Sequence, residues 1–328
     1  MIFAMVVLGG VTRLTGSGLS IVEWKPLLGI VPPLNAGEWE ELFRKYRQFP
    51  EYRLLNPGMT LAEFKTIFWI EYAHRLWGRL IGLVFLVPFL YFLVKGALGE
   101  RLRLHLAVIL VLGGLQGLLG WYMVKSGLDA DPAVSQYRLA AHLASAFLIY
   151  GYILWIALGL LAPRRGPDPA IRGLRRFALV IGAVTFLTVL SGAFVAGLDA
   201  GLAYNTFPLM DGRLAPAEIF MLRPLVLNFF ANVATVQFDH RWLATILVVL
   251  VLLLWLKSWS VDLPARTRAA FHLLLAVAFL QAGLGIATLV LVVPVSFAAA
   301  HQAGALMLFS FALWVAHELR PGPGNRGI

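Results

Sequence analysis

The sequence contains no cysteine among its 328 residues. Disulfides, iron–sulfur clusters and zinc sites built on thiolates are therefore excluded, and histidine is left as the obvious metal ligand. Charged residues are also scarce, at 13% of the chain, whereas 60% of the residues are hydrophobic and the mean hydropathy is +0.80. This composition is typical of a protein that crosses the membrane several times, and it excludes an ordinary soluble domain.

Long apolar runs are what the sequence has instead, because a membrane-spanning helix needs about 20 apolar residues. The apolar stretch 1–12 is shorter, and we interpret it as the outer part of a first helix whose start is missing. Seven further segments are long enough, at 66–94, 104–124, 138–161, 177–197, 232–256, 269–293 and 296–316. The sequence predicts an all-α membrane protein with eight transmembrane helices.

The net charge of +10 is concentrated in alternate short loops, which argues against nucleic acid as a partner. The positive-inside rule places these loops and both termini in the cytoplasm. The expected location is the bacterial inner membrane, as a multi-pass protein. The basic residues are Lys95, Arg101, Arg103, Arg164, Arg165, Arg172, Arg175, Arg176, Lys257, Arg266, Arg268, Arg320 and Arg326. The polar connection 20–65 then forms an outer cap, with a short amphipathic helix around 38–46.

Two short motifs recur in the second half of the chain. VLGG at 7–10 resembles VLSG at 189–192, and LQGLLG at 115–120 resembles LQAGLG at 280–285. Each half has four predicted spans, so both insert with the same orientation, as parallel repeats do. We expect two pseudo-symmetric four-helix bundles, formed by residues 1–162 and 177–328 and joined by a cytoplasmic linker at 163–176.

Four histidines stand near the outer starts of apolar segments: His74, His142, His240 and His301. A single intramembrane histidine is often only a hydrogen-bonding group between helices. Four in equivalent positions instead make two pairs of axial ligands, one on each side of a porphyrin iron. A small residue follows each histidine by four positions and leaves room for a flat ring: Gly78, Ala146, Ala244 and Ala305.

The two halves differ at one ionisable residue. Glu71 precedes His74 by three positions on a helix, and Gln237 precedes His240 in the same way. A carboxylate can accept a proton, activate water or stabilise a developing cation, whereas an amide cannot take the proton. The N-terminal half is therefore the better place for chemistry, unless Glu71 serves only as an ion-pair partner of Arg75 four residues on.

Four arginines lie near the histidines and could bind porphyrin propionates by charge-assisted hydrogen bonds. They are Arg75, Arg79, Arg138 and Arg241.

Several longer motifs resemble those of the haem A synthase family, in its α-proteobacterial and mitochondrial branch. They are GGVTRLTGSGLSIVEWKP, EFKTIFWIEYAHRLWGRLIG, GWYMVKSGL, VSQYRLAAHL, AGLDAGLAYNTFPLMDG and VQFDHR, and together they cover almost the whole chain. Some members of the family carry a cysteine pair in the first outer loop, which this sequence lacks.

The resemblance implies an oxidoreductase that converts the C8 methyl group of haem O to the formyl group of haem A, for assembly of cytochrome oxidase. It implies that His74 and His142 flank the substrate haem, that His240 and His301 bind the iron of a haem b, and that Glu71 is catalytic. The expected partners are a haem O synthase that delivers the substrate, an unidentified electron donor or acceptor and membrane lipid, and a homo-oligomer is compatible with the sequence.

Two other functions stay open at this point. A dihaem electron-transfer cytochrome would explain the four histidines but not the difference between Glu71 and Gln237. A transporter built from repeats would use the histidines as proton relays and would bind no haem.

Overall fold

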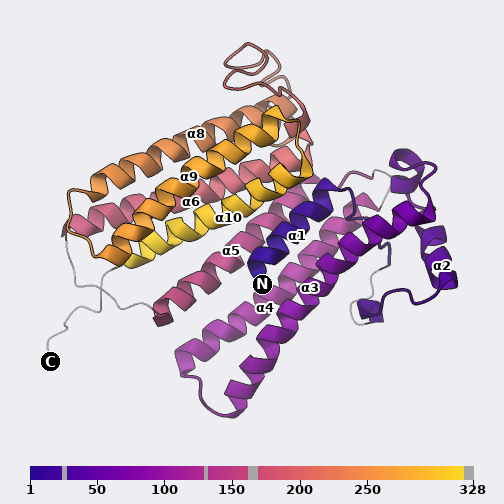
Figure 1. Ribbon diagram of the computed structural model, residues 1–328, viewed down its shortest axis with the longest axis horizontal. Coiled ribbons are helices and arrows are strands. Elements are labelled where there is room, and N and C mark those ends of the chain that lie inside the picture. Colours follow the sequence, from indigo (N-terminus) through magenta and orange to yellow (C-terminus); the bar gives the residue numbers. More distant parts are fainter. Residues whose placement is uncertain (24–27, 129–131, 162–168, 321–328) are drawn as a thin grey trace. The chain divides into compact units, whose positions relative to one another are not determined.

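The computed structural model describes residues 1–23, 28–128, 132–161 and 169–320, and its main elements are helices (Figure 1). The chain divides into two compact units, Met1–Ala146 and Phe147–Ile328. Arg164, Arg165 and Arg326, which entered the loop-charge argument, lie outside the described residues, as does the 163–168 part of the predicted linker.

Seven helices in the described part of the chain are long and apolar enough to cross a membrane, which confirms the prediction of a helical multi-pass protein. They are α3 (Leu61–Val94), α4 (Glu100–Gly127), α5 (Gln136–Leu161), α6 (Pro169–Gly197), α8 (Val233–Ser258), α9 (Ala265–Val290) and α10 (Val295–Glu318). Helix α1 (Ile2–Leu14) is apolar but has only 13 residues.

In the first unit, α1, α4 and the short helix α2 (Ala36–Tyr46) each pack against α3. Helix α3 begins five residues earlier than predicted, at Leu61, because a capping box starts it there. The hydroxyl of Thr60 accepts a hydrogen bond from the backbone N–H of Glu63, and the carboxylate of Glu63 accepts one from the backbone N–H of Thr60. These polar first residues conceal the start of the helix from a search for apolar runs.

The segment before α3 folds around aromatic side chains. Helix α2 and the turns η1 (Leu28–Ile30) and η2 (Glu51–Leu55) belong to it. Trp39 and Tyr46 of α2 are buried against Phe64 and Phe68 at the start of α3, with the Trp39 and Phe68 rings 4.9 Å apart and nearly perpendicular. Burial of four large rings fixes this cap to the end of α3 that carries Glu71.

In the second unit, α6, α8, α9 and α10 contact one another in a closed ring (Figure 1). Their inward-facing side chains form one apolar core, which includes Ile181, Leu254 and Leu274. The later turns of α5 join this unit, where Phe147 and Gly151 pack on Phe309 of α10. Between α6 and α8 the chain forms η3 (Ala200–Leu202), η4 (Leu225–Leu227) and α7 (Asn228–Ala231).

Candidate functional site

His240 on α8 and His301 on α10 face each other inside the second unit. Their ring centres are 6.4 Å apart and their planes are perpendicular. A metal–imidazole bond of about 2 Å on each side, with about 1 Å from each nitrogen to its ring centre, separates two axial imidazoles by roughly 6 Å. The measured spacing therefore fits two ligands on opposite sides of one metal atom.

The donor set indicates what kind of metal group would fit. Among the described residues, no group of three or more His, Asp or Glu side chains is placed to hold a bare metal ion. A porphyrin supplies the equatorial ligands of its own iron and asks the protein only for axial ones. A pair of histidines is thus sufficient for haem and insufficient for an ion alone.

Each imidazole of this pair lies against a glycine of the neighbouring helix. A Cβ atom placed on Gly192 of α6 would lie 3.0 Å from Cε1 of His240. A Cβ atom placed on Gly285 of α9 would lie 2.7 Å from Cε1 of His301. Both separations are shorter than ordinary van der Waals contact, so a larger residue at either position would displace its imidazole.

The first unit repeats this arrangement with His74 on α3 and His142 on α5. A Cβ atom on Gly9 of α1 would lie 3.0 Å from Cε1 of His74, and one on Gly120 of α4 would lie 2.9 Å from Cε1 of His142. The two histidines are close enough that a charge on one would act on the other. The structure thus brings the predicted histidines together as two pairs.

Glu71 is buried on α3 and holds the start of the polar connection. Its Oε2 accepts hydrogen bonds from the Ser20 hydroxyl (2.7 Å) and from the Ile21 backbone N–H (2.8 Å). Its Oε1 accepts one from the Arg75 guanidinium at 2.5 Å. Arg75 also donates to the carbonyl of Ile21 at 2.8 Å. The ion pair with Arg75 therefore exists, within a larger cluster that also binds the backbone.

Gln237 is buried at the matching position of α8, but its surroundings are of opposite polarity. Its Nε2 donates to the carbonyls of Ala200 (2.7 Å) and Ala203 (2.5 Å), and its Oε1 accepts from Arg241 at 2.9 Å. Arg241 in turn donates to the carbonyl of Tyr204. In each half one arginine therefore bonds a neighbouring loop, but only in the N-terminal half is its side-chain partner a carboxylate.

Comparisons with known proteins show the family of this chain. Residues 1–313 match the model of a family described as cytochrome oxidase assembly protein (COX15-CtaA). The chain belongs to this family. It is 60% identical over 322 residues to a protein of Nitrosospira multiformis named heme A synthase, a match that covers 98% of this chain and 90% of that protein. Two mammalian members of the family named heme A synthase COX15 are 51% identical (Bos taurus; 97% of this chain, 79% of that protein) and 49% identical (Homo sapiens; 97% and 80%).

The predicted room for a flat ring beside Gly78, Ala146, Ala244 and Ala305 stays a prediction, and the structure shows which residues contact Gly78 and the His74 ring. Gly78, four residues after His74, faces Met5 of α1, because a Cβ atom there would lie 3.3 Å from the methionine Cε. The ring of His74 rests instead on Gly9. The glycines that contact the imidazoles come from the neighbouring helices, and all four of them, Gly9, Gly120, Gly192 and Gly285, lie within the motifs that recur between the two halves.

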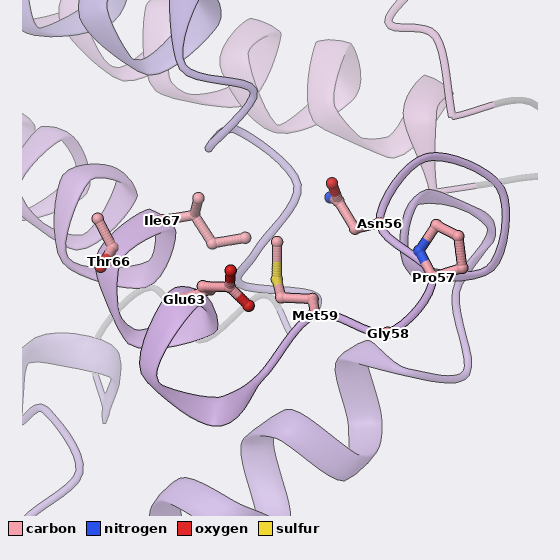
Figure 2. Close-up of a pocket in the computed structure, with 7 residues that line it drawn as sticks. All are labelled: Asn56, Pro57, Gly58, Met59, Glu63, Thr66 and Ile67. Atoms are coloured by element: carbon pink, nitrogen blue, oxygen red, sulfur yellow. The ribbon is translucent and has the colours of Figure 1, made fainter.

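The remaining predicted arginines lie on the same helices as the histidines. Arg79 follows Arg75 by one turn of α3. Arg138 of α5 donates to the carbonyl of Tyr122 at 2.9 Å and stacks over the ring of Tyr122 at 3.8 Å. Figure 2 shows a separate pocket between the turn before α3 and the first two turns of α3, lined by Asn56, Pro57, Gly58, Met59, Glu63, Thr66 and Ile67. None of the predicted site residues lines this pocket.

Proposed function

We propose that this chain is a haem A synthase, which oxidises the C8 methyl group of haem O to a formyl group and so provides haem A for cytochrome oxidase. The observation that carries the proposal is the difference between two otherwise matching sites. Glu71 stands one turn before His74, and Gln237 stands one turn before His240, each bonded to an arginine four residues on. Membership of a family whose relatives are named heme A synthase supports the same function.

In this proposal His240 and His301 bind the iron of a resident haem b, and His74 and His142 bind the iron of the substrate haem. The 6.4 Å spacing of the first pair and the glycine behind each imidazole support the assignment. When bound, the haem iron supplies redox chemistry that no side chain of this chain can provide. Arg75, Arg79, Arg138 and Arg241 are the proposed partners of the propionates.

Glu71 is the residue that this chain would use on the methyl group. Oxidation of a methyl to a formyl group releases electrons and protons and adds oxygen, so a nearby base or anion is needed. A carboxylate has about four acceptor positions, and three donors occupy Glu71, namely Ser20, Ile21 and Arg75. One position remains for a proton or for a developing positive charge, while the three bonds hold the carboxylate in place.

The architecture proposed for the whole chain is eight transmembrane helices in two pseudo-symmetric four-helix bundles. The N-terminal half, 1–162 with its outer cap, holds the substrate, and the C-terminal half, 177–328, holds haem b. Both termini lie on the cytoplasmic side of the bacterial inner membrane. The proposed partners are a haem O synthase as supplier of the substrate, an electron donor or acceptor, membrane lipid and, in a homo-oligomer, a second copy of the chain.

The decisive experiment is extraction of the porphyrins from purified protein, followed by chromatography. Haem b together with haem O or haem A supports the synthase. His240→Ala should remove haem b and leave haem O or haem A bound in the N-terminal half. Haem b alone, at both sites of the wild-type protein, would favour the dihaem electron-transfer cytochrome, and absence of any porphyrin would favour a transporter.

A further inference from the structure

The hydrogen bonds behind the histidines differ between the halves. In α6 the hydroxyl of Ser191 donates to the carbonyl of Thr188 at 2.8 Å, which uses its only hydrogen. The same oxygen lies 2.8 Å from Nδ1 of His240, so it accepts there and Nδ1 is the donor. The proton of the neutral ring is then on Nδ1, and Nε2 is left with the lone pair that a metal needs. Ser191 therefore favours this tautomer and helps to hold the His240 ring, together with the backbone of Thr188, which also forms a hydrogen bond with the ring.

The matching position in α1 is Leu8. Gly9 and Gly192 stand in the same place relative to their imidazoles, because a Cβ atom on either would lie 3.0 Å from Cε1 of the facing histidine. The residue before each glycine is Leu8 in α1 and Ser191 in α6. This alignment pairs Gly9 with Gly192, whereas the match of VLGG with VLSG pairs Gly10 with Gly192, so the two alignments differ by one residue. It also pairs Ile21 with Tyr204, whose carbonyls both accept from the arginine of the cluster.

Leu8 offers no side-chain hydrogen bond, and the consequence is visible at His74. Within the described residues, Nδ1 of His74 is buried and has no hydrogen-bond partner. A ligand histidine almost always donates this proton to a second residue, and loss of that residue costs about 10–100-fold in metal affinity. Of the two equivalent histidines, His240 is fixed by a hydroxyl and His74 is held by packing alone.

The other histidine of the N-terminal pair does have a partner. The amide of Gln116 in α4 lies 3.1 Å from Nδ1 of His142, and its other end accepts from the hydroxyl of Ser145 at 2.6 Å. The end that faces Nδ1 is the amide nitrogen, which also donates to the backbone carbonyl of His142 at 2.9 Å, so Nδ1 accepts a hydrogen bond from Gln116. In the C-terminal half Gly304 takes the place of Ser145, and Nδ1 of His301 has no partner among the described residues. In each pair, one histidine thus has a side-chain partner at Nδ1 and the other has none among the described residues.

We propose that His74 is the exchangeable axial ligand of the substrate haem, with His142 as the fixed one, and that Ser191 prevents the same exchange at His240. This inference rests on the proposed function. Its consequence is that the coordination position which opens is on the His74 side, and His74 follows Glu71 by one turn on the same face of α3. In the N-terminal half, His74 beside the carboxylate of Glu71 leaves the iron. In the C-terminal half, His240 beside the amide of Gln237 stays bound.

The first experiment removes the hydroxyl group of Ser191. Ser191→Ala should raise the rate at which haem b passes from the purified protein to an excess of apomyoglobin by about 10–100-fold. Ser191→Thr keeps the hydroxyl and should restore slow release, which separates this effect from misfolding. Ser310→Ala is the matched control, because its hydroxyl bonds Tyr150 and Leu306 and not a histidine. Release of haem b from Ser191→Ala at the wild-type rate would overturn the role of Ser191.

The second experiment is Leu8→Ser, which adds beside His74 the hydroxyl group that Ser191 provides beside His240. In the reduced protein, binding of carbon monoxide to the N-terminal haem should fall at least tenfold, and the high-spin signal of the oxidised N-terminal haem should decrease. Unchanged binding and an unchanged signal would overturn the assignment of His74 as the exchangeable ligand. These outcomes are distinct from failure of the proposed function, which extraction of the wild-type porphyrins reveals independently of Leu8 and Ser191.

Discussion

The two halves of this protein bury their apolar helices to very different extents. Only 6% of the most apolar stretch of α3, of α4 and of α5 is buried, against 17% to 33% for α6, α8, α9 and α10. The second group also closes a ring around a continuous core. Segments with few buried contacts open at low cost, whereas a packed core does not. This contrast suits a half that exchanges a large planar substrate and a half that keeps its haem.

A second contrast lies at the loops that contact Glu71 and Gln237. The loop beside Glu71 presents donors, namely the Ser20 hydroxyl and the Ile21 N–H, whereas the loop beside Gln237 presents the carbonyls of Ala200 and Ala203. Each buried side chain therefore matches its own loop. An exchange of carboxylate and amide would leave buried donors or acceptors unsatisfied, at about 1–3 kcal/mol for each group.

The largest effect is expected from Glu71→Gln, which gives the N-terminal site the residue of the other half. Loss of an acid–base group typically costs at least ~10²-fold in rate, so haem A formation should fall by that factor while haem O accumulates in the N-terminal half. The measurement is the ratio of haem A to haem O, by chromatography, in cells with an intact supply of haem O.

The control must account for the loop, because the amide also disturbs the bonds to Ser20 and Ile21. Ser20→Ala removes one of these bonds and keeps the carboxylate, so it should reduce haem A formation several-fold at most. A loss from Ser20→Ala as large as that from Glu71→Gln would mean that Glu71 only anchors the loop. Near-normal haem A from Glu71→Gln would contradict the catalytic role directly.

The sequence alone predicts the long helices well, since apolar runs of membrane length have few alternative structures. It also predicts the four histidines and the Glu71/Gln237 pair, because these stand at fixed spacings along single helices. The start of α3 is missed because the polar residues Thr60 and Glu63 begin the helix. Spacing along one helix does not reveal which neighbour faces it, so Gly9, Gly120, Gly192 and Gly285 cannot be assigned to their imidazoles without the structure.

A smaller effect is expected when one of these glycines gains a methyl group. In Gly285→Ala the new Cβ would lie 2.7 Å from Cε1 of His301, so the imidazole must shift. Overpacking of this kind costs about 1–3 kcal/mol, and the affinity for haem b should fall by roughly 10–100-fold at 1.4 kcal/mol for each factor of ten. Haem b per protein, measured after exposure to a haem-binding competitor, reports the change.

The matched control is Gly283→Ala on the same helix, where a Cβ atom would meet no atom within 4 Å. It should retain haem b as the wild-type protein does. Gly120→Ala applies the same test to the N-terminal half, because its Cβ would lie 2.9 Å from Cε1 of His142, and there the loss should appear as less bound haem O. Equal retention by Gly285→Ala and Gly283→Ala would show that the close contact does not position His301.

The smallest effect concerns the cap that precedes α3, where Glu51 is a buried carboxyl group. Burial, together with the nearby charge of Glu71, raises the pKa of Glu51 to about 7, although a hydrogen bond with Tyr46 opposes the shift. The folded cap then binds more protons than the unfolded chain between the two pKa values, so its stability falls as the pH rises through this range. Between pH 6 and pH 8 the loss should be about 1 kcal/mol. Hydrogen exchange of the α2 amide groups, corrected for the intrinsic rate at each pH, measures this loss of stability.

Glu51→Gln should remove the pH dependence, whereas Glu40→Gln, at an exposed position of α2, should preserve it. A pH dependence that persists in Glu51→Gln would mean that another group of the cap titrates in its place.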